Sequence, residues 1–166
     1  MHLAQWPLAA TLQSFGEGSN TGCGCLSWST GRFEAPTLVA GGNHLVLYRY
    51  AKNSITGTQS WQPLIKLPST EKSGILSVAW APNVGRRFHF IASVDGTHLT
   101  LYKISRDLVP PSTGNTGTSK TAGGSVPRVL AVQTIKTVAW QVQWNVTGTV
   151  LAVSGDSGKV QLCKIN

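Results

Sequence analysis

The chain has 166 residues, of which 41% are apolar and 12% charged, so it can bury a core and is not disordered by composition. Few charged residues, together with 18 glycines and 6 tryptophans, are typical of short strands and tight turns and exclude a helical bundle. The formal net charge of +8 suggests a nucleic-acid partner, but the basic residues are scattered and only Arg86 and Arg87 are adjacent. A basic surface without a nucleic-acid site is therefore favoured.

Three successive segments share one plan. Each has an alternating strand that ends at a tryptophan, a nearly all-apolar strand, a turn with Gly and often Asp, and a third strand of alternating apolar residues that closes on Tyr or Cys. This is a repeated antiparallel meander, in which the Asp-Gly and Ser-Gly pairs supply the positive φ of a hairpin turn. The three copies run over 25–48, 76–102 and 142–163.

Taken in chain order, the predicted elements divide the sequence into consecutive four-stranded blades, of which we expect the first and the last to be incomplete. Residues 1–13 contain an apolar segment, 8–12, that is expected to be the outer strand of a preceding blade. The later segments are a blade over 21–68, a blade core over 74–104, a disordered low-complexity loop over 105–127, an outer strand over 128–135 and an incomplete last blade over 138–166.

The spacing of the tryptophans supports a β-propeller. The interval from Trp80 to Trp144 is longer than a WD-type blade of about 40–45 residues, but leaving out the low-complexity loop brings it to about 41. A tryptophan at the end of a strand needs a second sheet to pack against it. We therefore predict an all-β fold, a partial WD-repeat β-propeller of about three blades. Its structural repeat positions are Trp28, Trp80, Trp144, Asp95 and Asp156.

Short strings that imitate catalytic motifs do not assemble into a site. Ser157 lies in a string that resembles the nucleophile loop of trypsin-like proteases, but no His–Asp pair is placed to complete a triad, so a hydrolase is the weaker hypothesis. Asp95 and Asp156 occupy equivalent turn positions roughly a blade apart and are not an acid–base pair. The three cysteines lack the partners of a zinc set and are expected to be reduced thiols. We therefore expect no catalytic residue, no metal and no cofactor, and we expect that the protein is not an enzyme.

The last copy of the plan has no outer strand, so its final strand should have an unpaired edge. Val160 and Leu162 alternate along that strand and are the expected partner-facing residues. Unpaired edges and exposed apolar patches mark interaction surfaces. We therefore expect an obligate assembly subunit.

Three strings carry a family resemblance: Cys-Leu-Ser-Trp at 25–28, Val-Ala-Trp-Ala-Pro-Asn-Val-Gly-Arg at 78–86, and the segment 140–152. They resemble the WD-repeat family of the nucleoporin Seh-one and the coat protein Sec-thirteen, with the second string closer to the Seh-one branch. The resemblance covers nearly all of 6–165 and corresponds to the carboxy-terminal three blades. We therefore expect a fragment or a truncated version of a longer protein. Each blade departs from the consensus because it lacks the Trp-Asp dipeptide.

The resemblance implies a structural scaffold. Family members are open six-bladed propellers to which a helical-solenoid nucleoporin of the Y-shaped nuclear pore complex donates a blade in trans, which is a form of β-augmentation. The expected function is therefore that of an outer-ring (Y-complex) subunit at the nuclear envelope that supports protein and mRNA transport, without a small-molecule substrate. The alternatives are a coat subunit of COPII vesicles or of the lysosomal or vacuolar nutrient-signalling complex, with indirect contact to a membrane, and a basic nucleic-acid-binding propeller.

Overall fold

The computed structural model describes residues 8–12, 23–31, 34–52, 57–69, 74–106 and 127–165. Within these ranges the secondary structure is entirely β, with no helix. The strands are β1 (Cys25–Trp28), β2 (Thr37–Gly41), β3 (Leu45–Lys52), β4 (Gln59–Leu67), β5 (Ser77–Trp80), β6 (Phe88–Val94), β7 (His98–Ser105), β8 (Val129–Lys136), β9 (Gln141–Trp144), β10 (Val150–Ser154) and β11 (Val160–Lys164).

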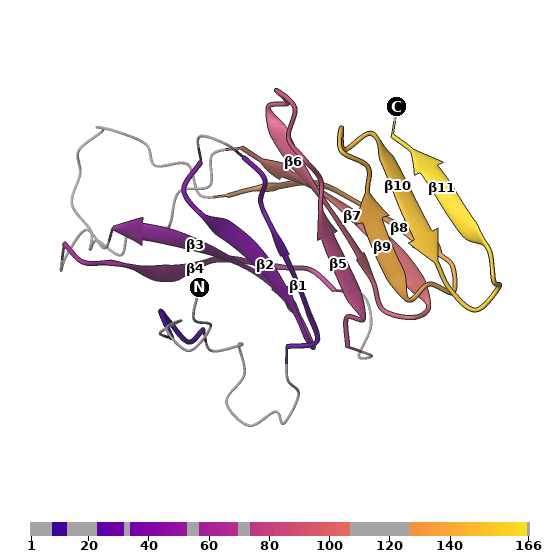
Figure 1. Cartoon of the computed structure of the whole chain (residues 1–166), viewed down its shortest axis with the longest axis horizontal. Helices are drawn as coiled ribbons and strands as arrows, with labels where there is room; N and C mark the ends of the chain where they lie inside the picture. The colour runs from indigo at the N-terminus through magenta and orange to yellow at the C-terminus, as the bar shows by residue number, and fades with distance from the viewer. Residues whose placement is uncertain are drawn as a thin grey trace, which may run out of the picture.

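The strands form three antiparallel sheets, and each sheet follows the chain as a meander. The first blade holds β1 to β4, the second β5 to β8, and the third β9 to β11. Figure 1 shows the three blades side by side, fanned out from the first to the last. The expectation of an incomplete first blade is wrong, because all four of its strands lie between residues 25 and 67.

The blades meet through their first strands. β1 contacts β5, and β5 in turn contacts β9, so the three first strands lie next to one another while the later strands spread outward. This is the arrangement of a propeller, in which each sheet packs its faces against its two neighbours. The predicted fold class, an all-β partial WD-repeat propeller, is confirmed.

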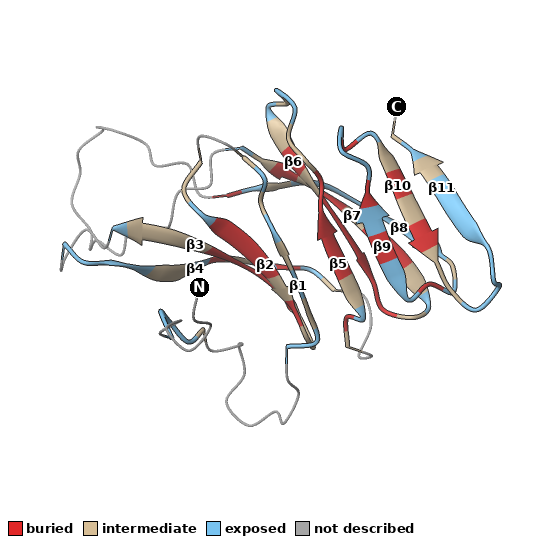
Figure 2. Ribbon diagram, viewed as in Figure 1, coloured by how far each residue is buried: buried red, intermediate tan, exposed pale blue. Residues whose placement is uncertain are grey.

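Apolar cores fill the spaces between the blades. Leu45 and Leu47 of the first blade pack with Ile91 and Ile104 of the second, and all four are 0% exposed. A second core joins the second blade to the third. Figure 2 shows this burial along the middle of the fan, whereas β11 at its end is mostly exposed. Each Å² of apolar surface removed from water stabilises the fold by about 25 cal/mol, so these cores hold the blades together.

Serine hydroxyls connect the first strands of neighbouring blades. The backbone N–H of Trp80 donates to Ser27 Oγ at 2.9 Å, and the N–H of Val142 donates to Ser77 Oγ at 3.3 Å. The first strand of each blade is a sheet edge, so these N–H groups have no ladder partner on that side. The serines satisfy them across the blade boundary and fix the position of one blade against the next.

The hairpin turns use glycines as predicted. Gly96, between β6 and β7, has a φ of 93°, and Gly158, between β10 and β11, has a φ of 66°. An L-residue with a side chain rarely adopts such values, whereas glycine does so without steric cost. The predicted positive φ at these turns is confirmed.

The expected outer strand of a preceding blade is not formed in its described part. Residues 8–12 carry no strand, and the rest of 1–13 lies outside the described residues. Leu12 instead packs on the face of the first blade, against a cluster that includes Val46 and Tyr48. Within the described residues no blade covers this apolar face, which leaves it open to Leu12.

Most of the predicted loop of the second blade lies outside the described residues, whereas its predicted outer strand lies within them. Of the loop expected over 105–127, residues 107–126 lie outside the described part of the chain. At its two ends Ser105 and Arg128 are paired: the N–H of Ser105 donates to the Arg128 carbonyl, and the N–H of Arg128 donates to Ser105 Oγ, both at 2.9 Å. The outer strand predicted over 128–135 corresponds to β8.

Candidate functional site

The three predicted tryptophans occupy the same register position, the last residue of each blade's first strand. Trp80 and Trp144 are buried between blades, at 4% and 8% exposure. Trp28 is 51% exposed, and its ring lies 5.7 Å from that of Trp61 on the outer face of the first blade. A tryptophan at this register position is therefore buried only where a preceding blade covers it, as at Trp80 and Trp144.

The two predicted turn aspartates lie between the second and third strands of their blades but are not equivalent in register. Asp95 directly follows β6, and its Oδ1 accepts hydrogen bonds from the N–H groups of Thr97 and His98 at 2.9 and 2.7 Å. Burial raises the pKa of Asp95, but these hydrogen bonds outweigh burial, so the pKa lies below its usual value. Asp156 is exposed and lies one residue further from the end of its strand. Their predicted equivalence is therefore wrong, because the third blade has a longer turn.

One position on the third strand differs between the blades. In each blade, one residue of the second strand pairs with the tryptophan on one side and with this third-strand position on the other. The third-strand residue is Tyr48 in the first blade, Tyr102 in the second and Cys163 in the third. Tyr102 is 1% exposed, and its hydroxyl donates to the carbonyl of Pro68 at 2.8 Å, so its ring fills the space between the first and second blades. Cys163 is a much smaller residue in the same place.

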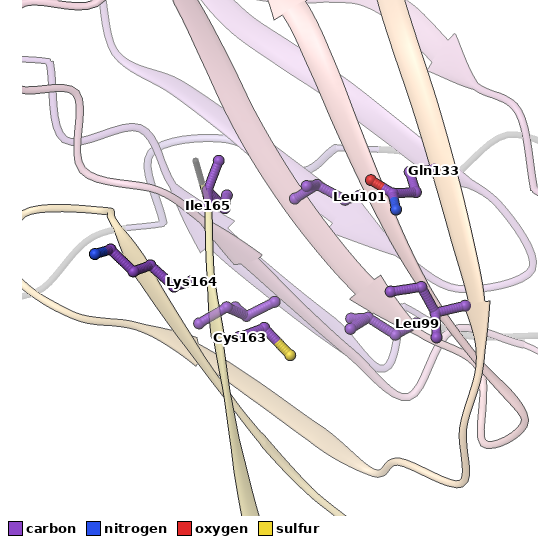
Figure 3. A pocket seen from close by; sticks show the side chains of 8 residues that line it. Leu99, Leu101, Gln133, Cys163, Lys164 and Ile165 are labelled. Atoms are coloured by element: carbon purple, nitrogen blue, oxygen red, sulfur yellow. The ribbon is translucent and has the colours of Figure 1, made fainter.

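A pocket of about 240 Å³ opens beside Cys163, between the second and third blades. Figure 3 shows Leu99 and Leu101 on one wall and Cys163 with Ile165 on the other. The lining is apolar except for Gln133 and Lys164. It consists of Leu99, Leu101, Gln133, Ile135, Leu151, Cys163, Lys164 and Ile165.

The pocket adjoins an open sheet edge. Among the described residues β11 pairs with β10 and with no other strand. Val160 and Leu162 are 65% and 71% exposed, whereas Leu45 and Leu47, at the same register positions of the first blade, are 0% exposed because the second blade covers them. The predicted partner-facing residues therefore lie on an uncovered apolar strand next to an apolar pocket.

A chain of polar contacts, buried at His89 and exposed at Arg106, joins the first blade to the second. Trp80 Nε1–H donates to His89 Nδ1 at 3.4 Å, His89 Nε2 lies 3.5 Å from Glu34 Oε2, and Arg106 Nε–H donates to Glu34 Oε1 at 3.3 Å. The His89 side chain is 0% exposed. Burial lowers the pKa of His89 more than the nearby Glu34 raises it. A neutral imidazole suits this geometry, because Nδ1 must keep a lone pair to accept from Trp80.

The described residues contain no group of three or more His, Cys, Asp or Glu that could hold a metal, and no helix that could span a bilayer. Burial, and then the neighbouring Cys23, raise the pKa of Cys25 to about 11, so this thiol stays protonated near neutral pH and is a poor nucleophile. Ser157 lies exposed in its turn, where its hydroxyl accepts from the N–H of Lys159 at 3.4 Å.

Sequence reasoning found the open edge but missed the pocket. The signal was present in the repeat itself, since Cys163 stands where the other two blades have tyrosine. The contact between Glu34 and His89 was missed as well, and no spacing rule would have found it, because the two residues belong to different blades.

These features define a partial β-propeller of the WD-repeat class with an open third blade. No protein-family model matches the chain. Among curated proteins it is similar to nucleoporin SEH1, with 32% identity over 174 residues to that of Homo sapiens, 30% over 178 to that of Bos taurus and 28% over 176 to that of Danio rerio.

The similarity to nucleoporin SEH1 extends over the whole chain. It covers 100% of this chain and 44–45% of each of those proteins, so the chain spans a little under half of the length of these relatives. The resemblance predicted from the motifs is therefore confirmed. The names of these relatives are those of nucleoporins and not of enzymes.

Proposed function

We propose that the chain is a structural scaffold subunit of the nuclear pore complex outer ring, the Y-complex. There it binds a helical-solenoid nucleoporin and supports nucleocytoplasmic transport at the nuclear envelope. The observation that carries the proposal is the similarity of the whole chain to proteins named nucleoporin SEH1.

The open third blade is the part of the molecule that such a role would use. An added strand would satisfy the free backbone groups of β11, and a packed sheet would cover Val160 and Leu162, now 65% and 71% exposed. The third blade is joined to the second by a buried apolar core, so it can present this edge without a large change in shape.

The alternative functions are less well supported. A coat subunit of COPII vesicles or of a lysosomal or vacuolar complex would use the same edge, but the similar proteins are named as nucleoporins. A nucleic-acid-binding propeller needs clustered positive charge, whereas the 14 Lys and Arg residues are dispersed along the chain. Steep loss of heparin binding with rising salt would favour that alternative.

The test is co-expression of the 166-residue chain with candidate helical-solenoid nucleoporins, followed by affinity purification. We expect the wild-type chain to capture one of them, and we expect the double variant Val160→Asp/Leu162→Asp to lose at least tenfold of that capture. Val146→Asp is the matched control, because Val146 is 88% exposed but lies in the turn before β10. A chain that captures no Y-complex subunit and stays a monodisperse, cooperatively unfolding monomer would refute the proposal.

A further inference from the structure

Positive charge is distributed unevenly between the two rims of the blades. One rim, called the basic rim below, is where the first strands end, and the arrows of β5 and β9 point to the same side of the fan in Figure 1. The third strands end at this rim and the fourth strands begin there, because the strands are antiparallel. The basic rim carries Lys52, Arg86, Arg87, Arg106, Arg128 and Lys164.

The opposite rim has a more balanced charge. Among the described residues it carries Lys66, Lys136 and Lys159, together with the carboxylates of Asp95 and Asp156. The residues of the basic rim are dispersed along the sequence. The fold gathers them, because every second turn of an antiparallel meander returns to the same rim.

Three arginines meet where the basic rim crosses the second blade. Phe88 on β6 pairs with Ser105 on β7, and Arg87 and Arg106 are the next residues beyond this pair. On the other side of β7, the N–H of Ser105 donates to the carbonyl of Arg128 at 2.9 Å. Neighbouring strands lie about 4.8 Å apart, so the backbones of the three arginines span about 10 Å. Arg87, Arg106 and Arg128 are called the arginine cluster below.

The charge of the arginine cluster is only partly balanced. Arg106 Nε–H donates to Glu34 Oε1 at 3.3 Å, yet the Arg106 side chain is 50% exposed. Arg87 and Arg128 are exposed and form no ion pair with a described carboxylate. The segment 107–126, which joins Arg106 to Arg128, contains one Asp and one Lys and adds no net charge. Like charges on neighbouring strands destabilise a sheet, so folding alone does not account for the cluster.

The guanidinium group indicates what the cluster binds. It has five N–H donors in a planar fork, which match the two oxygens of a carboxylate. Arg106 already binds the carboxylate of Glu34 through Nε–H, and its other donors remain for a ligand. A protein that binds duplex DNA commonly makes about six to ten phosphate contacts. Three arginines suit a shorter acidic ligand.

An exposed apolar side chain lies in the same loop as Arg87. Val84 is 66% exposed. The loop is held in place, because the N–H of Arg86 donates to Asn83 Oδ1 at 2.9 Å and the Arg86 side chain donates to two carbonyls of the β9–β10 turn. A fixed valine beside a charged cluster favours a peptide, which offers carboxylates and apolar side chains together.

We propose that the arginine cluster is a docking surface for an acidic, extended segment of a partner protein. Carboxylates of the segment pair with Arg87, Arg106 and Arg128, and an apolar side chain of the segment covers Val84. In an extended segment, alternate side chains lie on the same face about 7 Å apart, which matches arginines on neighbouring strands. The surface is separate from the edge of β11, so the inference goes beyond the proposed function.

The probe is a fluorescent, capped peptide of alternating Glu and Val, and its binding to the 166-residue chain would be measured by anisotropy. The same peptide with Gln in place of each Glu tests the need for charge, and a labelled single-stranded oligonucleotide of similar charge tests nucleic acid. The variant is Arg87→Gln/Arg128→Gln. The matched control is Lys136→Gln/Lys159→Gln, which removes the same charge from two exposed lysines at the opposite rim.

We expect the Glu peptide to bind at least about tenfold more tightly than the Gln peptide in dilute buffer, because charge-assisted hydrogen bonds are roughly twice as strong as neutral ones. The arginine variant should lose about tenfold in affinity for the Glu peptide, and the lysine control should lose less than about twofold. Both arginine side chains are exposed, so a urea titration should show nearly unchanged stability. Should the double variant not fold, Arg87→Gln alone, with an expected loss of about threefold, decides the question.

Four results would overturn the inference. The first is no binding of the Glu peptide, and the second is equal affinity for the Glu and Gln peptides. The third is an equal loss in the arginine variant and the lysine control, since binding would then follow net charge only. The fourth is tighter binding of the oligonucleotide than of the Glu peptide, which would assign the cluster to nucleic acid. None of these results affects capture of a nucleoporin at β11, so the proposed function is judged separately.

Discussion

Replacing Trp144 by alanine should loosen the third blade from the second. The Trp144 ring is 8% exposed and stacks on Phe90, with centroids 6.3 Å apart and planes 19° from parallel. Its Nε1–H donates to the carbonyl of Ala79 at 3.0 Å. The substitution therefore removes a large buried ring and also leaves a buried carbonyl without this donor.

The expected magnitude follows from these contacts. Truncating a buried Phe or Trp to Ala costs about 3–5 kcal/mol. We expect about 4 kcal/mol here, which includes the lost hydrogen bond. Trp28→Ala is the matched control, because Trp28 has the same register position but is 51% exposed. Its ring contact with Trp61 is worth about 1 kcal/mol, and that is the cost we expect.

Hydrogen exchange measured by mass spectrometry is the suitable assay, since each blade contacts only its neighbours and can open locally. About 4 kcal/mol corresponds to roughly a thousandfold faster exchange in β9 to β11, with little change in the first blade. The argument is that burial against the preceding blade gives Trp144 its role. It would be refuted if β9 to β11 exchanged at similar rates in the Trp144→Ala chain and the wild type, or if Trp28→Ala cost as much free energy of unfolding as Trp144→Ala.

The remaining predictions concern charge, turns and the loop. Folding lowers the pKa of His89 from 6.5, so the unfolded chain binds this proton more readily than the folded chain. The contribution of His89 to stability should therefore be complete above about pH 6.5 and fall as the pH drops below that value. His89→Gln should remove this part of the pH dependence of urea unfolding. Arg86→Ala removes charged hydrogen bonds of 2.9 and 2.8 Å to two carbonyls of the β9–β10 turn, and should lower the free energy of unfolding by about 1–2 kcal/mol. Arg87→Ala is the control, because Arg87 is exposed, and should cost less than about 0.5 kcal/mol in the same urea titration. A Cβ on Gly155 would overlap the Val138 carbonyl oxygen, so Gly155→Ala should lower the thermal midpoint clearly. Deleting residues 107–126 should leave the midpoint nearly unchanged, because Ser105 and Arg128 already pair at the ends of this segment, and a large drop would show that the segment packs.

The sequence by itself determined the order of the strands and the position of each repeat. Alternation along the strands, a tryptophan at the end of each first strand and glycines at the hairpins were enough to predict three antiparallel meanders. These features are local: the period of a strand and the positive φ of a turn depend on neighbours in the chain, as at Gly96 with its φ of 93°. The open edge at β11 followed from the same counting of strands.

Only the tertiary structure decided what each repeat position does. Trp28 and Trp80 have the same place in the pattern, yet one is 51% and the other 4% exposed, because a blade covers only the second within the described residues. The contact of His89 with Glu34 and the pocket beside Cys163 likewise arise between blades. The periodicity of a strand reports which face of the strand is apolar. It does not report which sheet lies opposite that face, and the sheet opposite sets burial, pairing and empty volume.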